Sequence, residues 1–278
     1  MSVLSAILYG ILQGATEFLP VSSSGHLALA HYLFGIEDVE VNYLLFDILL
    51  HLGTLVAVFI AYFKDIQLLV VEFCKMVADM AKGKGANLQN PHRKMGIMLI
   101  LSTLPLGLVL PIKGWIESFH AKPLVVGGAL MVTGLMLWFI DSKKNAVKPY
   151  EIQNAPMRAG VTIGLFQAVA TLPGISRSGA TITGGILCGF SRELAVKYSF
   201  LMSIPAIVGA NLLSIKDLQG VEPELIFPFV VGMIAAAITG FFAIRLITYL
   251  AMRKNFRFFS RYCLAVGFIA IIAALVLQ

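Results

Sequence analysis

The chain has 278 residues, of which 58% are hydrophobic and only 13% charged, and its mean hydropathy is +0.87. A soluble domain of this size could not cover so much apolar surface, so the composition excludes soluble globular proteins and predicts a polytopic membrane protein. The net charge of +6 is interpreted as a consequence of membrane topology and not as a sign of nucleic-acid binding. The three cysteines are widely spaced, which excludes a disulfide framework or a zinc site.

The first apolar segment, about residues 1–34, is interrupted by a proline and a serine-rich turn. Residues 13–26 spell QGATEFLPVSSSGH, which places a carboxylate, three serines and a histidine inside an apolar run. An ionisable group at membrane depth is costly, so Glu17 indicates function and not packing. The halves around the turn are too short to cross a bilayer, so we expect a re-entrant helix–turn–helix. No basic region or cleavage site precedes the segment, so no removable signal peptide is expected.

Six longer stretches reach the roughly 20 apolar residues that a membrane span needs. They lie at about 43–63, 95–112, 124–141, 195–214, 226–250 and 261–277. In the first stretch Asp47 and His51 lie four residues apart, where we expect either a mutually satisfied pair or partners of a nearby site. The segment 64–94 is expected to be a polar, solvated connector, and contact of its basic face with anionic lipid headgroups is the alternative.

A second broken segment, about residues 158–190, repeats the first at an offset of 154 residues, the separation of Gln13 and Gln167. The other pairs that match without a gap are Gly10 and Gly164, Ser22 and Ser176, Ser24 and Ser178, and Gly25 and Gly179. Such a duplication with broken helices is typical of membrane proteins whose site lies between internal repeats. We therefore expect one membrane domain, 1–278, with halves 1–145 and 155–278 that each hold one re-entrant segment and three spans.

The distribution of basic residues predicts the orientation. With the N-terminus outside and only the six long stretches crossing, 16 of the 21 basic residues lie in inner segments and three in outer loops. Both termini and the segments around 37–40 and 217–224 are then outside, and 82–94 is inside. Because three spans separate the two broken segments, the duplication is inverted. The expected fold class is an all-α polytopic membrane protein with an inverted-topology repeat, six transmembrane helices and two re-entrant segments.

Each S-x-S-G turn is followed by a helix start, predicted at Gly25 and at Gly179. A helix N-terminus offers free backbone N–H groups and a partial positive charge, which suits a phosphate group. Serine hydroxyls add hydrogen-bond donors, and the glycines allow the backbone to approach a ligand closely. Inversion of one repeat would bring the two helix starts face to face near the membrane interior.

The two copies differ at the positions that carry chemistry. Glu17, Ser23 and His26 have no like counterpart in the second copy, and they are the usual parts of an activated nucleophile and an acid–base pair. The second copy holds Arg177 instead, which suits an anion clamp. The first half is therefore expected to act on a phosphate that the second half helps to bind.

Two motifs identify a resemblance that covers essentially the whole chain. The run from Gln13 to His26 is similar to an (E/Q)-x-x-x-E signature with its serine–histidine turn, and the run from Pro173 to Thr181 is similar to P-G-x-S-R-S-x-x-T. Both are motifs of the undecaprenyl-pyrophosphate phosphatase family of bacitracin-resistance proteins. The resemblance implies hydrolysis of undecaprenyl pyrophosphate to undecaprenyl phosphate, which recycles the carrier lipid for peptidoglycan synthesis. It also implies a multi-pass protein of the bacterial inner membrane, with an outward-facing site and a divalent cation, Mg²⁺ or Ca²⁺.

Carried over position by position, the resemblance implies catalytic roles for Glu17, Ser23, His26 and Arg177, with Glu17 also a metal ligand. The residues that it implies for substrate binding are Gln13, Ser22, Ser24, Gly25, Ser176, Ser178, Gly179 and Thr181. Gln13 stands where many family members have glutamate, and a neutral amide cannot be a second anionic metal ligand. Either Ser23 or a water attacks the terminal phosphorus, with His26 or Glu17 as the base, and the sequence leaves both choices open.

A different class of function is also compatible with the pattern. Inverted repeats with broken helices describe alternating-access carriers, so a transporter or flippase for a polyprenyl phosphate is the alternative. The set of Glu17, Ser23 and His26, which is present in one repeat alone, favours the phosphatase. The expected partners are the lipid substrate and membrane lipids, without nucleic acid, and assembly into a homo-oligomer is left open.

Overall fold

The computed structural model describes residues 1–34, 40–142, 149–215, 222–253 and 255–276. Its described part is built from helices and holds no β-strand. The α-helices are α1 (Val3–Phe18), α2 (Ser23–Phe34), α3 (Glu40–Ala61), α4 (Phe63–Ala81), α5 (Pro91–Thr103), α6 (Lys113–Glu117), α7 (Pro123–Ser142), α8 (Arg158–Val169), α9 (Arg177–Leu187), α10 (Arg192–Ile215), α11 (Pro223–Met252) and α12 (Arg257–Val276). Three 3₁₀ segments, η2 (Leu104–Leu108), η3 (Leu110–Ile112) and η4 (Ser118–Ala121), follow α5. The all-α fold class is confirmed.

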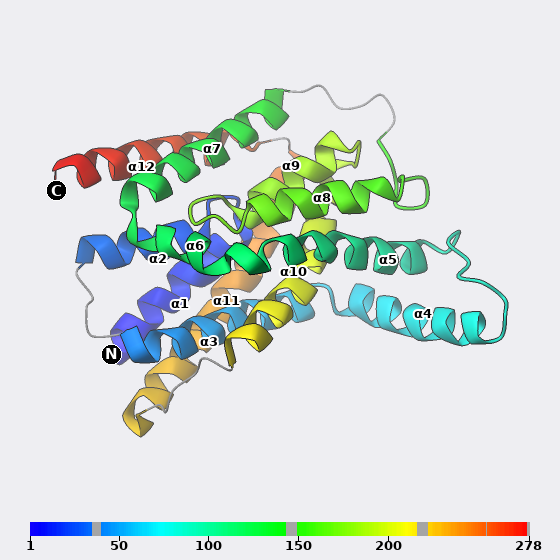
Figure 1. Ribbon diagram of the computed structural model, residues 1–278, viewed down its shortest axis with the longest axis horizontal. Coiled ribbons are helices and arrows are strands. Elements are labelled where there is room, and N and C mark those ends of the chain that lie inside the picture. The colour runs from blue at the N-terminus through cyan, green and yellow to red at the C-terminus, as the bar shows by residue number, and fades with distance from the viewer. Residues whose placement is uncertain (35–39, 143–148, 216–221, 254, 277–278) are drawn as a thin grey trace.

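Within the residues that the structure describes, six helical stretches are long and apolar enough to cross a membrane, and each overlaps a predicted span. They are Leu44–Ala61, Pro91–Ala121, Pro123–Ser142, Arg192–Ser214, Pro223–Met252 and Arg257–Val276. The chain is therefore a multi-pass membrane protein. The start of α1 and the end of α12 lie at one end of the molecule, and the α4–α5 hairpin projects from the other end (Figure 1).

Both broken segments are helix–turn–helix pairs, α1 with α2 and α8 with α9, of 16, 12, 12 and 11 residues. Helices this short do not cross a bilayer core of about 30 Å. Both second helices begin two residues earlier than predicted, at Ser23 and at Arg177. The S-x-S-G serines therefore lie within the first helical turn or cap it.

The first broken pair is fixed to the body by close packing of α1 on α11. A methyl group on Gly10 would overlap the Gly232 carbonyl, and one on Gly14 would overlap the Thr239 hydroxyl. Small residues allow helix backbones to approach closely in a membrane, where no hydrophobic force drives helices together. The catalytic candidates near the end of α1 are thus carried on a rigid support.

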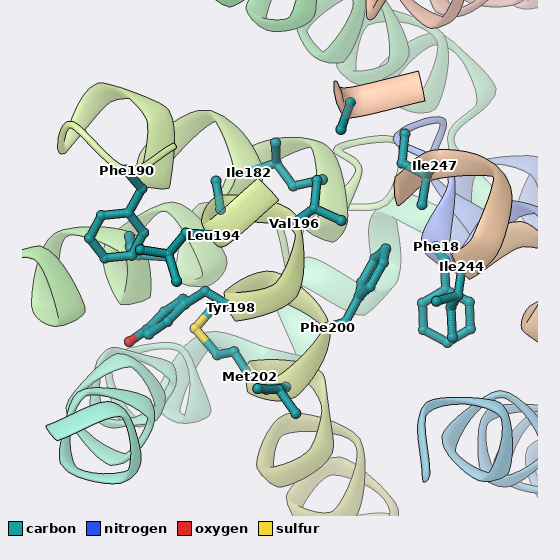
Figure 2. Close-up of a cluster of buried hydrophobic side chains, with 14 of the residues drawn as sticks. Phe18, Ile182, Phe190, Leu194, Val196, Tyr198, Phe200, Met202, Ile244 and Ile247 are labelled. Carbon is teal, nitrogen blue, oxygen red and sulfur yellow. The ribbon is translucent and has the colours of Figure 1, made fainter. Parts of the chain in front are cut away.

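The main hydrophobic core includes side chains of α1, α9, α10 and α11, several of which Figure 2 shows. Phe18, next to Glu17 in the chain, packs edge-on against Phe200 of α10 with a centroid distance of 5.3 Å. Both aromatic side chains are fully buried. Ile182 of α9 and Ile244 of α11 belong to the same cluster. The core therefore ties the end of α1 to the second half of the chain.

The expectation of a plain connector over 64–94 is wrong. Residues 63–81 form α4, and α5 begins at Pro91, capped by the Asn90 side chain, which accepts hydrogen bonds from the backbone of His92 and Arg93. The turn between the helices holds Gly83 and Gly85 at φ of 72° and 75°, a conformation that glycine adopts at little cost. Charged residues interrupt the apolar run of α4, which conceals its helical periodicity from a search for long apolar stretches.

Candidate functional site

The two S-x-S-G turns share a capping pattern, although Ser22 has a φ of 71° and Ser176 a φ of −69°. Ser22 accepts a hydrogen bond from the Gly25 N–H (3.2 Å), and Ser176 accepts one from the Gly179 N–H (3.0 Å). Each of these serines also pairs with the serine two residues on, at 3.4 Å for Ser24 and 3.1 Å for Ser178. A serine side chain in this position caps the helix and satisfies one of its free N–H groups. The repeated sequence motif thus corresponds to a repeated cap at the start of each helix.

The two turns lie against each other. A methyl group on Gly25 would come within 2.9 Å of the Gly174 Cα, so only glycine allows this contact. The Ser178 hydroxyl crosses between the turns and donates to the Leu19 carbonyl at 3.1 Å. The helix starts of α2 and α9 therefore meet at one place, and their partial positive charges add there.

A residue that the sequence analysis missed holds the second turn in place. Thr133 of α7 is fully buried, and its hydroxyl accepts from the Ser176 N–H (3.0 Å) and donates to the Gly174 carbonyl (3.1 Å). Gly174 has a φ of 96°, in the left-handed region that favours glycine. No local signal marks Thr133, because its partners lie more than 40 residues away.

Glu17 is the hub of the polar contacts. One of its carboxylate oxygens, Oε1, accepts from the Arg177 guanidinium of the other turn. The second oxygen, Oε2, accepts from the Ser23 hydroxyl at 2.7 Å and from the Gln13 amide at 3.0 Å. Glu17 and Gln13 are buried, and a buried carboxylate needs such partners. The structure thus brings the predicted carboxylate, hydroxyl and guanidinium together.

His51 and Asp47 extend this cluster into α3. The Nδ1 atom of His51 donates to the Asp47 backbone carbonyl (2.9 Å) and lies 3.5 Å from its carboxylate, while Nε2 lies 3.8 Å from Oε2 of Glu17. Both predicted alternatives for this pair therefore hold: the residues contact each other, and His51 also faces the site.

His26 is held by contacts on both ring nitrogens. Nδ1 lies 2.8 Å from the Ser22 backbone carbonyl, and a carbonyl can only accept, so Nδ1 carries a proton. Nε2 lies 2.8 Å from the hydroxyl of Tyr262 in α12, and the two rings stack with an interplanar angle of 6°. Tyr262 was not predicted, since a tyrosine inside an apolar span carries no signal of its own.

The Thr181 hydroxyl is engaged by the first turn of α9 and by α10. It donates to the Arg177 backbone carbonyl (2.8 Å) and pairs with Ser199 of α10 (2.6 Å), and it is buried. In this arrangement Thr181 links the first turn of α9 to α10. It thereby supports the backbone that carries Arg177.

The residues present do not form a cage for a cation. Among the described residues no three His, Cys, Asp or Glu side chains cluster as metal ligands. Both oxygens of Glu17 already accept hydrogen bonds, and Gln13 beside it is neutral. Divalent cations such as Mg²⁺ take oxygen ligands and are commonly bound by one or two carboxylates together with substrate phosphates. These side chains alone do not fit a resident ion.

Comparisons with known proteins extend over nearly the full chain. A family model described as bacitracin resistance protein BacA matches residues 6–269. A relative from Alkaliphilus metalliredigens, named undecaprenyl-diphosphatase, is 42% identical over 99% of this chain and 100% of its own length. Relatives with the same name from Methanosphaera stadtmanae and Desulforapulum autotrophicum are each 36% identical, over 100% and 99% of this chain and the full length of both relatives.

Proposed function

Because the chain belongs to the family of the bacitracin resistance protein BacA, we propose that it is an integral-membrane undecaprenyl-diphosphatase. It hydrolyses undecaprenyl pyrophosphate to undecaprenyl phosphate and phosphate, returns the carrier lipid to peptidoglycan synthesis and confers bacitracin resistance. The name that the relatives carry favours this activity over a transporter or flippase. The polyprenyl tail lies among the apolar helices while the pyrophosphate enters between the two turns.

The contact that carries the proposal is the hydrogen bond from the Ser23 hydroxyl to Glu17. It pairs a nucleophile with a base at 2.7 Å, within the reach that proton transfer requires. His26 is less well placed as the base for Ser23, because its two ring nitrogens face Ser22 and Tyr262. Of the two bases that the sequence left open, the geometry favours Glu17.

The proposed reaction has two steps. Ser23 Oγ attacks the terminal phosphorus and gives its proton to Glu17, the bond from phosphorus to the bridging oxygen breaks, and undecaprenyl phosphate leaves. A water then attacks the phosphoserine, the bond from phosphorus to Ser23 Oγ breaks, Oγ takes back the proton that Glu17 holds, and the protons of the water leave with the inorganic phosphate. The activation free energy is lowered because hydrogen-bond donors of both turns surround the phosphate before charge develops on it.

Arg177 is suited to bind the pyrophosphate. A guanidinium has five N–H donors, and Glu17 uses only its Nη2. The remaining donors, with the backbone N–H groups at the starts of α2 and α9, bind phosphate oxygens. Ser22 and Ser176 act indirectly by capping these helices, and Thr181 acts by supporting the Arg177 backbone. A divalent cation, Mg²⁺ or Ca²⁺, would be held chiefly by the pyrophosphate oxygens, whose negative charge it would offset.

The proposal also includes the inverted repeat of halves 1–145 and 155–278, both termini outside and an outward-facing site. The position of α1 and α12 opposite the α4–α5 hairpin is consistent with this orientation (Figure 1). The segments predicted outside at 37–40 and 217–224 lie largely beyond the described residues.

The test is phosphate release from undecaprenyl pyrophosphate by the purified protein. We expect Ser23→Ala, Glu17→Gln and His26→Ala to lose several orders of magnitude in turnover, as removal of a nucleophile, its base or a histidine that orders the turn does. Ser24→Ala, the matched control, removes one weak hydroxyl contact at 3.4 Å and should keep measurable activity. A phosphoryl group on Ser23 in quenched wild-type protein supports the covalent route. Substantial turnover by Ser23→Ala would exclude it in favour of an attacking water.

A further inference from the structure

Helix α4 turns all three of its acidic residues toward the rest of the protein. Glu72 and Asp79 both pair with Arg93 of α5, at 3.1 and 2.8 Å, and Asp65 pairs with Lys197 of α10 at 2.6 Å. Hydrogen bonds from Lys75 and Arg93 hold the pKa of Glu72 below its usual range, so it is ionised. The negative charges of α4 are thus neutralised on its inner side.

The outward side of α4 is apolar. Five large side chains spaced by seven, three, four and three residues lie on one face of the helix. This α4 stripe consists of Phe63, Val70, Phe73, Val77 and Met80, which are between 41% and 63% exposed. Single exposed apolar residues are ordinary, but a continuous stripe marks a surface that another apolar phase covers.

Lysines lie on the polar side of α4, away from the centre of the α4 stripe. Lys75 pairs with Glu72 at 2.8 Å, so the remaining positive charge of α4 is carried by Lys64 and the C-cap residue Lys82, which are both exposed. An apolar face with lysines on the polar face is typical of helices that lie in the interface of a bilayer. The flexible stems of the lysines let the charged ends reach the headgroups.

We propose that α4 lies on the bilayer surface at the hairpin end of the molecule, with the α4 stripe among the acyl chains and its lysines on anionic headgroups. The stripe continues the exposed apolar surface of α3 at Val56, Phe59 and Ile60, which faces lipid in a membrane-spanning helix. The chain leaves helical geometry at Tyr62, which allows α4 to take a direction different from that of α3.

The test uses the native Cys74, which is exposed beside the α4 stripe. The full-length Cys188→Ser protein carries a nitroxide on Cys74 and is placed in nanodiscs of phosphatidylcholine, with or without phosphatidylglycerol. Collision with oxygen, which is concentrated in lipid, should exceed collision with a water-soluble nickel complex several-fold. The control places the label on Lys84→Cys in the exposed turn, with Cys74→Ser, and should show the reverse.

The lipid charge is tested separately. Adding phosphatidylglycerol should lower the nickel collision rate at Cys74, and Lys64→Gln with Lys82→Gln should abolish that decrease. Equal nickel collision rates at Cys74 and at the Lys84→Cys label would overturn the proposal, and so would dipolar broadening between labels, which would indicate a second copy of the chain. A Cys74 label in lipid that does not respond to phosphatidylglycerol would remove the assignment to anionic headgroups.

Discussion

The contact between the two turns makes Gly25→Ala the most informative substitution. The added methyl would lie 2.9 Å from the Gly174 Cα and 3.3 Å from the Gly174 nitrogen, whereas carbon atoms pack best at about 3.5–4.0 Å. Backbone atoms cannot rotate away as a side chain would. The turns must therefore separate by about 0.6–1 Å to accept the methyl.

The expected effect on catalysis is larger than the effect on stability. Ser23 and Glu17 lie on one turn and Arg177 on the other, so separating the turns moves these groups apart. Misplacement of reacting groups by about 1 Å costs on the order of 100-fold in rate. Overpacking of this kind costs about 1–3 kcal/mol of stability, which a membrane helix bundle should survive. We therefore expect folded protein with about 100-fold lower turnover in the phosphate-release assay.

The matched control is Gly128→Ala on α7, where an added methyl would meet no atom within 4 Å. Alanine favours a helix over glycine by about 1 kcal/mol, so this variant should keep both activity and thermal stability. Wild-type turnover by Gly25→Ala would refute the argument that the two turns act as one site. Loss of folded protein in detergent would instead show that the contact is needed for assembly.

Three further predictions concern the second turn and the orientation. Arg177→Lys keeps the charge but loses the planar fork, so kcat/KM should fall by about 10–100-fold, which corresponds to about 1.5–3 kcal/mol for a charge-assisted bond; near wild-type kinetics would remove the role of the fork. Thr133→Val leaves the Ser176 N–H and the Gly174 carbonyl without a partner, which costs about 2–5 kcal/mol and should lower the thermal midpoint, whereas Thr133→Ser should restore it; equal midpoints for both variants would contradict this account. In intact cells an impermeant thiol reagent should label Lys122→Cys and not Lys84→Cys, each with Cys74→Ser, and the opposite result would reverse the orientation.

The parts of the site that the sequence predicts are those that repeat or that are costly to bury. Ser22 and Ser176 match at a fixed offset, and each caps the helix that follows it. Glu17 and Arg177 stand out because an ionised group in an apolar run needs a partner, and they prove to be partners of each other. Neither inference requires knowledge of the tertiary structure.

The parts that the sequence does not predict depend on contacts between distant elements. Thr133 and Tyr262 are unremarkable in their own helices, and only packing brings them to the turns. Helix α4 was not predicted for a different reason, because a search for long apolar runs stops at Lys64 and Asp65. A search for helical periodicity would have found it, since its apolar residues recur on one face.

The ion pair between Glu17 and Arg177 also has an evolutionary consequence. Its two members come from opposite halves of the chain, and the second half has Thr171 and Ala180 where the first has Glu17 and His26. Two identical halves would have formed two equivalent sites across a symmetric dimer. Each half would then have supplied both the carboxylate and the guanidinium. Once one half kept the carboxylate and the other the guanidinium, neither could change its turn alone. Gene fusion would then be irreversible, because separated halves could form at most one working site in a correctly matched heterodimer.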